Sequence, residues 1–264
     1  MTAPSRPCGP VASSRLPPAS PAKVRVVADA VVQGPSAGDA GGSLEEATGP
    51  QGREGAVMAA NLDLFRAARS EVLVVSPYFV PMPRMIDALT HANREGARVS
   101  VMTNSLATTD EPLVHHGYAR YRGALLQMGA ALYELMPASE PHPAWSGTEG
   151  ARGSLGRLHA KVAVVDQRSL YIGSMNMDRR SAHCNTEVGL IIDSAELAHD
   201  VTRLLQREQA PRSYRVRWAA AEQRVEWVQN QPGGARVFTS EPDSTWNSHL
   251  TTRALGLLVN EEML

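Results

Sequence analysis

The sequence is poor in cysteine, in aromatic residues and in long apolar runs, and it carries almost no net charge. Two cysteines are too few for a disulfide framework, so we expect a reducing compartment. No apolar run approaches the roughly 20 residues that span a bilayer, and the N-terminal residues lack the apolar core of a secretory signal. With 26 basic and 27 acidic residues the net charge is −1, so no nucleic acid partner is expected. Any membrane contact should therefore be peripheral.

The first 53 residues differ in composition from the rest of the chain. They hold eight of the 18 prolines, interleaved with glycine, alanine and serine. Such a composition buries too little apolar surface to offset chain entropy, so we expect residues 1–53 to be mostly disordered. Within them, Val24–Ala28 is apolar enough to form an isolated strand. We expect residues 54–210 to form the main folded unit and residues 211–264 a strand and helix extension packed on it.

Short apolar runs alternate with amphipathic segments in the middle of the chain. Strands are predicted at Glu71–Val75, Arg98–Thr103 and Ala130–Leu135, with helices over Pro83–Arg94 and Pro112–Met128 between them. This alternation predicts an α/β fold with a mixed, mostly parallel sheet flanked by helices. The carboxyl ends of parallel strands share one edge, where ligands gather in such sheets. Further predicted elements are a helix at Gly55–Arg69, a strand at Val188–Ile192, a helix at Ser194–Glu208, strands at Tyr214–Trp218 and Arg224–Val228, and a helix at Thr251–Leu264.

Residues 158–192 hold the densest set of reactive side chains. His159 and Lys161 stand at the start of an apolar run and are two residues apart, so they share one face of a strand. Ser174 and Asn176 follow a second short strand, in a turn that begins with glycine. Lysine and asparagine can hold the non-bridging oxygens of a phosphoryl group, and histidine can exchange protons or attack phosphorus. This combination predicts a site for a phosphoryl group.

The spacing His-x-Lys-x4-Asp-x6-Gly-Ser-x-Asn resembles the signature of the phospholipase D superfamily. Six positions at fixed spacing are a specific match, which disfavours a buried strand with a satisfied histidine. The resemblance implies the phospholipase D-like fold and a phosphodiester substrate. The matching positions are His159, Lys161, Asp166, Gly173, Ser174 and Asn176, and Glu187 stands where the family often carries an acidic residue.

Other segments resemble the bacterial cardiolipin synthases, especially those of type C. They are Ser76–Pro81, Thr103–Asp110, Val114–Tyr118 with Tyr121 and Arg122, Leu132–Leu135, and Glu241 and Pro242 with Trp246. Members of the superfamily usually carry two copies of the signature, which together form one active site, whereas this sequence carries one. We therefore expect a half-domain that a complementary N-terminal half completes. The alternative is a homodimer, as formed by single-copy relatives of the bacterial endonuclease type.

The resemblance implies a two-step reaction through a phosphohistidine. One histidine attacks phosphorus, while the other protonates the leaving alcohol and then removes a proton from the acceptor. The attacking histidine usually belongs to the first copy, so His159 is expected to act as the acid and base. Lys161 and Asn176 would hold the phosphoryl oxygens, and Glu187 would orient a catalytic histidine. No metal or other cofactor is implied.

Three further positions leave alternatives open. Ser174 either adds a donor to the phosphoryl oxygens or is simply small enough for its turn. The resemblance places Asp166 among the site residues. Its position on the strand has the opposite parity to those of His159 and Lys161, which favours a structural role, either capping a turn or pairing with a basic residue such as Arg180. Cys184 is either reactive or packed in the interior, and packing is favoured.

The helix predicted at residues 112–128 presents a second candidate set. His115, Tyr118 and Arg122 lie at positions i, i+3 and i+7, on one face of that helix. They either bind the substrate through a headgroup phosphate or form a solvated face. His115 and His116 have no acidic partner one turn further along, so a zinc site is not favoured.

Three functions are compatible with these features. The first is a phosphatidyltransferase of the cardiolipin synthase kind, with phosphatidylglycerol, phosphatidylethanolamine or cardiolipin as the phospholipid substrate. The second is a phosphodiesterase or nuclease that is active as a homodimer, with water as the acceptor. The third is an inert half that binds lipid or a partner. We expect peripheral contact with the cytoplasmic face of the bacterial inner membrane, or otherwise a cytoplasmic location.

Overall fold

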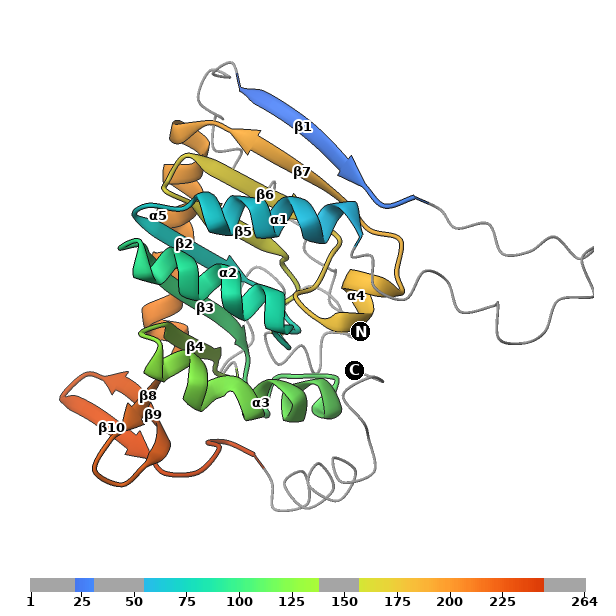
Figure 1. The fold of residues 1–264 in the computed structure, drawn as a ribbon. Helices are drawn as coiled ribbons and strands as arrows, with labels where there is room; N and C mark the ends of the chain where they lie inside the picture. The colour runs from blue at the N-terminus through green and yellow to red at the C-terminus, as the bar shows by residue number, and fades with distance from the viewer. Residues whose placement is uncertain (1–21, 31–54, 138–156, 245–264) are drawn as a thin grey trace, which may run out of the picture.

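A ten-stranded mixed sheet forms the centre of the structure (Figure 1). The computed structural model describes residues 22–30, 55–137 and 157–244. The strands lie in the order β1-β7-β6-β5-β2-β3-β4-β8-β9-β10. Their bounds are β1 Lys23–Ala28, β2 Glu71–Val75, β3 Arg98–Asn104, β4 Ala131–Leu135, β5 Val162–Val165, β6 Ser169–Gly173, β7 Val188–Asp193, β8 Ser213–Ala219, β9 Arg224–Gln231 and β10 Gly234–Phe238.

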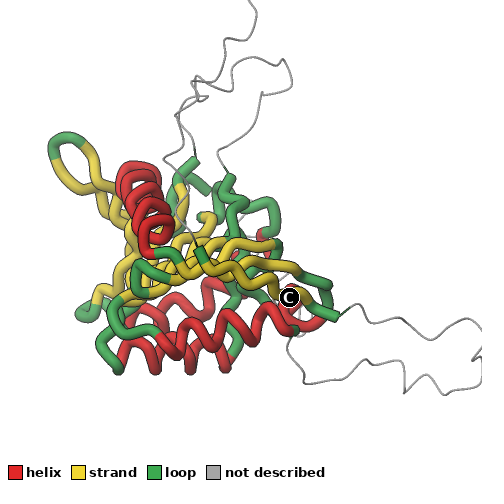
Figure 2. The backbone as a smooth tube through the Cα atoms, turned by 90° about the horizontal axis from the view of Figure 1, so that it is seen from above, coloured by secondary structure: helices red, strands yellow, loops and turns green. Residues whose placement is uncertain are grey.

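The helices cover the two faces of the sheet unequally. α1 (Ala56–Ala67), α2 (Pro83–Arg94) and α3 (Pro112–Gln127) lie on one face. In the described part of the chain, α5 (Ala195–Arg212) alone lies on the other face, as the view from above shows (Figure 2). α4 (Arg179–His183) is a short helix in the connection between β6 and β7. The protein is therefore three-layered, with one layer made of a single helix.

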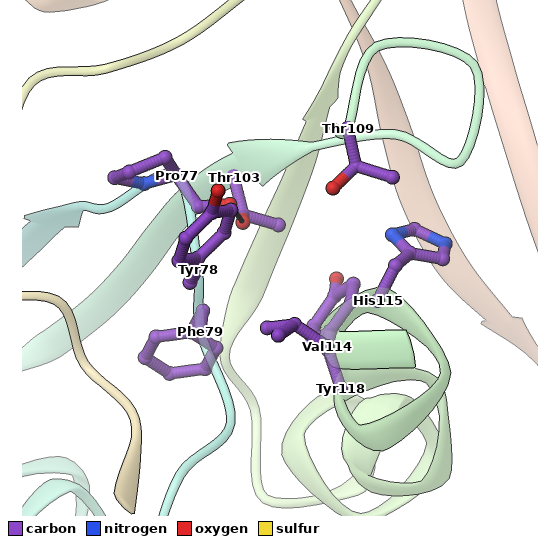
Figure 3. A pocket seen from close by; sticks show the side chains of 8 residues that line it. All are labelled: Pro77, Tyr78, Phe79, Thr103, Thr109, Val114, His115 and Tyr118. Atoms are coloured by element: carbon purple, nitrogen blue, oxygen red, sulfur yellow. Dashed lines mark hydrogen bonds between the residues drawn. The ribbon is translucent and has the colours of Figure 1, made fainter. Parts of the chain in front are cut away.

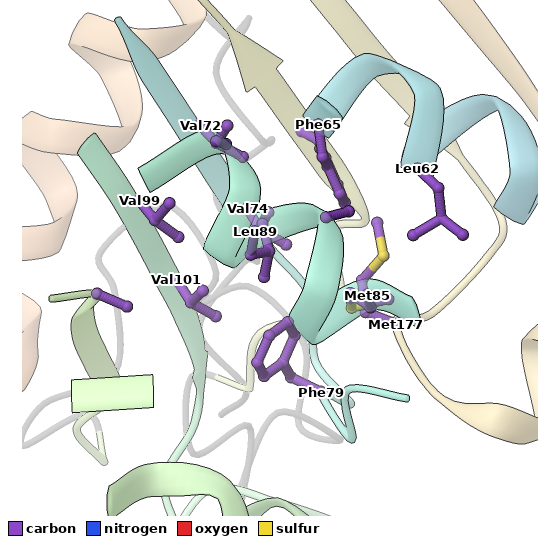
Figure 4. Packing of buried hydrophobic residues seen from close by; sticks show 14 of the residues in the cluster. Leu62, Phe65, Val72, Val74, Phe79, Met85, Leu89, Val99, Val101 and Met177 are labelled. Atoms are coloured by element: carbon purple, nitrogen blue, oxygen red, sulfur yellow. The ribbon is translucent and has the colours of Figure 1, made fainter. Parts of the chain in front are cut away.

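The central strands are apolar on both faces because helices pack on both. β2 is buried along its whole length. Val72 and Val74 join the main core with Phe65 of α1 and Leu89 of α2 (Figure 4), whereas Leu73 packs on the α5 side. Burying one such side chain contributes roughly 1.5–3 kcal/mol. This layer therefore provides a rigid base for the loops that follow the strands.

The prediction of an α/β fold with a mixed, helix-flanked sheet is confirmed, but the expectation of mostly parallel pairing is wrong. Among the described strands, only β2 with β3 and β3 with β4 pair in parallel. The other seven pairs are antiparallel. The parallel strands β2, β3 and β4 are those for which the sequence predicts an alternation of strands and helices, and α2 and α3 form the crossovers between them. Short turns join β5 to β6 and β8 to β9 to β10, and such turns connect antiparallel neighbours.

The apolar stretch expected near the N-terminus does form a strand, but it is not isolated. β1 pairs antiparallel with β7 at the edge of the sheet. Asp29 follows it and accepts hydrogen bonds from the backbone N–H groups of Val57 (3.0 Å) and Glu187 (3.1 Å), which ties β1 to α1 and β7. The expected disorder of the remaining part of residues 1–53 and the helix expected at Thr251–Leu264 lie outside the described residues.

The antiparallel pairing of β5 with β2 decides where the reactive residues lie. Val75 at the end of β2 pairs with Val162 at the beginning of β5. Gly173 at the end of β6 pairs with Gly189 near the beginning of β7. The beginnings of β5 and β7 and the end of β6 therefore share the edge at which the parallel strands β2, β3 and β4 end. We call this edge the rim.

Candidate active site

Asn104, at the end of β3, fixes the segment that leads into the site. Its side-chain oxygen accepts a hydrogen bond from the backbone N–H of Leu158 (3.0 Å), and its amide nitrogen donates to the backbone oxygen of Leu158 (3.2 Å). The same nitrogen donates to the backbone oxygen of Pro77 (3.4 Å), just after β2. Asn104 is buried, so these bonds are shielded from water. They place His159, the next residue, at the rim.

His159 and Lys161 stand side by side at the beginning of β5. His159 is exposed, and Lys161 is partly buried. The Lys161 ammonium donates to the backbone oxygen of His159 (3.1 Å), and the backbone N–H of Gly173 donates to the backbone oxygen of Lys161 (3.3 Å). Burial lowers the pKa of Lys161, while the carboxylates of Glu187 and Asp178 are the larger of the charges that oppose this shift. The turn at the end of β6 is thus held beside the histidine and lysine.

Ser174 has a hydrogen-bonding role in this turn. Its hydroxyl donates to the Glu187 carboxylate in a short contact and accepts from the backbone N–H of Val188 (3.0 Å). Glu187 is buried and also accepts from the Asn185 side chain (3.1 Å). The Ser174 hydroxyl thus donates within the protein, to Glu187, and its role as a donor to a phosphoryl oxygen stays a prediction. The role of Glu187 in orienting a histidine stays a prediction.

Asn176 lies in a loop that is joined to the loop after β2. The backbone N–H of Met177 donates to the backbone oxygen of Tyr78 (3.2 Å), and the N–H of Val80 donates to the backbone oxygen of Met177 (2.8 Å). Met177 and Phe79 reach into the main core (Figure 4). The Asn176 side-chain oxygen is buried without a hydrogen-bond partner in the described residues. The amide oxygen only accepts hydrogen bonds, so a contact from Asn176 to a phosphoryl oxygen would have to come from its amide nitrogen; this role of Asn176 stays a prediction.

Two acidic side chains near Lys161 were not among the predicted site residues. Asp178 is buried, caps α4 by accepting from the backbone N–H of Ser181 (2.7 Å), and has its pKa raised chiefly by burial. Asp110 accepts from the Tyr78 hydroxyl (2.9 Å), and burial followed by this bond raises the pKa of Tyr78. The sequence contains a cue for Asp178, because it stands directly before a short helix. Asp110 and Tyr78 meet only through the fold.

Asp166 lies at the other end of β5, away from His159 and Lys161. Its carboxylate accepts from the backbone N–H groups of Arg69, Ser70 and Glu71 (3.0, 2.7 and 2.9 Å) and from the Ser70 hydroxyl (2.9 Å). Burial opposes ionisation, but these bonds outweigh it and lower the pKa of Asp166. Asp166 therefore has a structural role: it caps the turn between α1 and β2, and its partners are in that turn and do not include Arg180.

His115, Tyr118 and Arg122 are brought together, but as a buried cluster. All three are buried, so of the two alternatives the solvated face is wrong. Arg122 donates to Glu134 (2.8 Å) and to Glu241, and its guanidinium also meets the His115 ring nitrogen (2.7 Å). Partners from β4 and from the C-terminal region, both distant in sequence, cause this burial. Each guanidinium nitrogen therefore has a partner inside the cluster, and a role of these residues in binding a headgroup phosphate stays a prediction.

The near end of this cluster borders a small cavity at the rim. Figure 3 shows that His115 and Tyr118 of α3 line this cavity on one side, and that Tyr78, in the loop after β2, and Thr103, near the end of β3, line it on the other. The cavity measures about 10 Å³, which is roughly the space of one water molecule. It is therefore too small to hold a headgroup.

His115, Glu134 and Glu241 also form a set of possible metal ligands, with ligand atoms within 4.8 Å of one another. The Arg122 guanidinium already supplies the positive charge among them, so a metal ion would have to displace it.

Cys184, expected to pack in the interior, is exposed at the end of α4.

In the described part of the chain, no helix has the length and apolar character to cross a membrane.

Comparisons with known proteins agree with this geometry. The sequence matches the family described as "Cardiolipin synthase, PLD-like domain" over residues 62–208. It is 32% identical over 209 residues to cardiolipin synthase C of Escherichia coli strain K12, covering 76% of this chain and 42% of that protein. The chain thus spans less than half of that relative.

Two solved structures share the fold. Nuc, a phospholipase D family member from Salmonella typhimurium, has a TM-score of 0.51 and 16% identity, covering 75% of this chain and 99% of that chain. Phosphatidylserine synthase from Haemophilus influenzae has a TM-score of 0.53 and 11% identity, covering 92% of this chain and 47% of that chain. The family match covers more than half of this sequence. The chain belongs to the cardiolipin synthase family of phospholipase D-like domains.

Proposed function

We propose that this chain forms one half of a phosphatidyltransferase active site of the cardiolipin synthase kind. The observation that carries this proposal is the joining of His159, Lys161 and the turn of Ser174 and Asn176 at one rim. Residues with a titratable, a cationic and a carboxamide side chain stand at this rim, beside a carboxylate that accepts a hydrogen bond from Ser174. Such a set suits a phosphodiester, whose negative oxygens need charged or polar donors.

The proposed reaction has two steps. In the first, one imidazole nitrogen attacks phosphorus, so that a P–N bond forms and the P–O bond to the leaving alcohol breaks, while the second imidazolium gives that alcohol its proton. In the second, the same group takes a proton from the acceptor hydroxyl, whose oxygen attacks phosphorus as the P–N bond breaks. We assign His159 the acid and base role. Lys161 and Asn176 would each lower the barrier by about 3 kcal/mol through the phosphoryl oxygens.

The second imidazole has to come from outside this chain's signature, because the sequence has a single His-x-Lys pair. A complementary N-terminal half or a second copy of the chain would supply it. The substrate would be a phospholipid, reached by peripheral contact with the cytoplasmic face of the bacterial inner membrane. The acceptor would be the headgroup hydroxyl of phosphatidylglycerol.

Two alternatives use the same rim. With water as the acceptor, the chain would be a phosphodiesterase or nuclease active as a homodimer. With no second histidine, it would be an inert half that binds lipid or a partner.

Radiolabelled phosphatidylglycerol given to the purified chain separates these functions. Cardiolipin is the expected product once a complementary N-terminal half or a second copy of the chain supplies the second signature. Phosphatidic acid would indicate hydrolysis. Binding without product would indicate an inert half. His159→Ala should abolish turnover and phosphoryl labelling. Retained turnover in His159→Ala would remove this histidine from the reaction and contradict the proposal.

A further inference from the structure

The loop after β2 contacts both segments that carry the signature residues. The amide nitrogen of Asn104 donates to the backbone oxygen of Pro77 (3.4 Å), in this loop, and to that of the residue before His159 (3.2 Å). Further along the loop, the backbone N–H of Met177 donates to the backbone oxygen of Tyr78 (3.2 Å). The loop therefore joins the segment before His159 to the loop of Met177, and Tyr78 belongs to this junction.

Buried hydrogen bonds fix the backbone of Tyr78. The hydroxyl of Ser76, which is fully buried, donates to the backbone oxygen of Tyr78 (2.6 Å) and accepts from the backbone N–H of Met177 (3.2 Å). Thr103 is also buried, and its hydroxyl donates to the backbone oxygen of Pro77 (3.2 Å). A side chain binds a ligand most effectively when its backbone is held in place before the ligand arrives. Tyr78 meets this condition.

Tyr78 and Asp110 form a pair at the rim. The Tyr78 hydroxyl donates to Asp110 Oδ1 (2.9 Å). Tyr78 is half-buried and lines the small cavity of Figure 3 together with Thr109, the residue before Asp110, whereas Asp110 itself is exposed. Burial, followed by the bond to Asp110, raises the pKa of Tyr78 well above its ordinary value, so the hydroxyl keeps its proton and stays the donor. Among the described residues, only the Tyr78 hydroxyl donates to Asp110, so Asp110 Oδ2 is an open acceptor.

The carboxylate of Asp110 lies within electrostatic reach of the phosphoryl site. Its charge acts on the Lys161 ammonium, as the charges of Glu187 and Asp178 do. A carboxylate repels the negative oxygens of a phosphoryl group, so Asp110 is not a ligand of that group. The part of a substrate that lies against Asp110 has to carry hydrogen-bond donors, as an alcohol or an ammonium group does.

A neutral alcohol fits this position better than an ammonium group. Lys161 already supplies a positive charge within reach of Asp110, and it would repel a second ammonium placed beside that carboxylate. A hydroxyl donates to Asp110 Oδ2 without adding charge. The bond from Tyr78 to Oδ1 meanwhile holds the carboxylate in one orientation. The position therefore points to a hydroxyl of an uncharged polyol.

The acceptor of the proposed reaction is the part of the substrate that this chain has to bind. His159 takes the proton from the acceptor hydroxyl in that reaction, so the acceptor lies on the side of the site that this chain forms. An acceptor with two neighbouring hydroxyls can give one proton to His159 and donate from its other hydroxyl to Asp110. Water and simple alcohols have no second hydroxyl, so they lose this contact.

We propose that Asp110 is a specificity-determining residue, which accepts a hydrogen bond from the hydroxyl next to the reacting one, and that Tyr78 positions its carboxylate. The acceptor is then a polyol, and the pair favours transfer to that polyol over transfer to water. The chemical step is that of the proposed function, on which the inference rests for the role of His159. The contact itself concerns binding, so it can be measured without turnover.

NMR titration of the full chain with two phosphate esters tests the proposal. Glycerol 1-phosphate resembles the acceptor after transfer, and propyl phosphate has the same length but no hydroxyls. The wild type should bind glycerol 1-phosphate about tenfold more tightly, because a hydrogen bond to a charged group contributes on that scale. Asp110→Ala should lower this ratio to about one, and Tyr78→Phe to about threefold, since the carboxylate is then free to turn. The ratio cancels the effect of a lost charge on the phosphate group, which both esters share.

Two further variants serve as controls. Glu111→Ala removes the neighbouring exposed carboxylate, which makes no capping hydrogen bond to α3, and should keep the wild-type ratio. Lys161→Met should weaken the binding of both esters to a similar extent, which places them at the rim. Circular dichroism of each variant establishes that it is folded.

Three results would overturn the proposal. One is a wild type that binds both esters with the same Kd. Another is an Asp110→Ala variant that keeps the wild-type ratio. The third is tighter binding of ethanolamine phosphate than of glycerol 1-phosphate, lost in Asp110→Ala, which would assign Asp110 to an ammonium group. Failure of the proposed function looks different: neither ester would bind, or Lys161→Met would bind both as tightly as the wild type, and the inference would fall with it.

Discussion

Arg122 is the centre of a buried ion network, and its replacement by methionine tests what that network does. The Arg122 guanidinium binds the carboxylates of Glu134 and Glu241 and lies 4.8 Å from the ring centre of Tyr118 and 5.1 Å from that of Trp227. Its side chain is 4% exposed, and that of Glu134 is fully buried. Methionine keeps an aliphatic chain between the two rings and removes only the charge and the donors.

The expected loss follows from leaving the Glu134 carboxylate without a cation. Breaking a buried pair by removing one partner costs about 3–5 kcal/mol of unfolding free energy. Tyr118 and Trp227 still donate to Glu134, at 3.2 and 2.8 Å, so the loss should lie in the lower part of that range. For a chain of this size, a loss of about 3 kcal/mol lowers Tm by roughly 6–12 °C.

Urea titration of the wild type, Arg122→Met, Glu134→Gln and the double variant measures the effect as a double-mutant cycle. The double variant should be more stable than Arg122→Met alone, because the fully buried Glu134 carboxylate is then gone, while Glu241 loses Arg122 in both variants. One outcome would refute this assignment of Arg122 to a structural network. If Arg122→Met unfolds like the wild type but binds inorganic phosphate more weakly, Arg122 is a ligand contact and the network is not its role.

Asp166→Asn is expected to lower the unfolding free energy by about 1.5 kcal/mol in urea titration, since it removes the charge that three backbone amides bind while keeping a residue that tolerates the positive φ of 53°; Asp166→Ala should cost more. Phosphate affinity, measured by calorimetry, is expected to fall at a lower pH than the ordinary lysine value of 10.5, because burial lowers the pKa of Lys161. Lys161→Arg should retain affinity to higher pH, and identical pH profiles would contradict this. Asn104→Asp should weaken phosphate binding and cost about 1–2 kcal/mol of stability, because it removes the donor to the segment before His159; phosphate binding at wild-type strength would show that this segment needs no clamp. The unfolding free energy of the wild type should fall more steeply than that of Glu241→Gln as pH decreases from 4.5 to about 2. Burial raises the pKa of Glu241, but the charge of Arg122 outweighs it and lowers the folded value to about 2. The stabilisation is then complete above 4.5 and lost on protonation below it, so equal slopes would exclude Glu241 as the responsible group.

The sequence by itself determined the local chemistry of the site. His159, Lys161 and Asn176 flank one short hairpin of β5 and β6, so local geometry brings them to the same end of that hairpin, and contacts with Asn104 and with the loop after β2 fix them there. The alternation of strands and helices that precedes them is likewise a local property, which is why it predicts β2, β3 and β4 as a parallel group. The period of two along a strand also predicts that Asp166, at the far end of β5, lies on the opposite face from His159 and Lys161.

Only the tertiary structure decided which distant groups meet. The antiparallel pairing of β5 with β2 depends on contacts between residues about 90 positions apart, and no local pattern encodes its direction. The burial of Arg122 depends on Glu241, 119 residues away, whose carboxylate compensates the charge of a buried guanidinium. Periodicity reports which side of an element is apolar, but the partner of a charged side chain is set by the packing of whole elements. For that reason His115, Tyr118 and Arg122 could be placed on one helix face from the sequence, while their removal from solvent could not be foreseen.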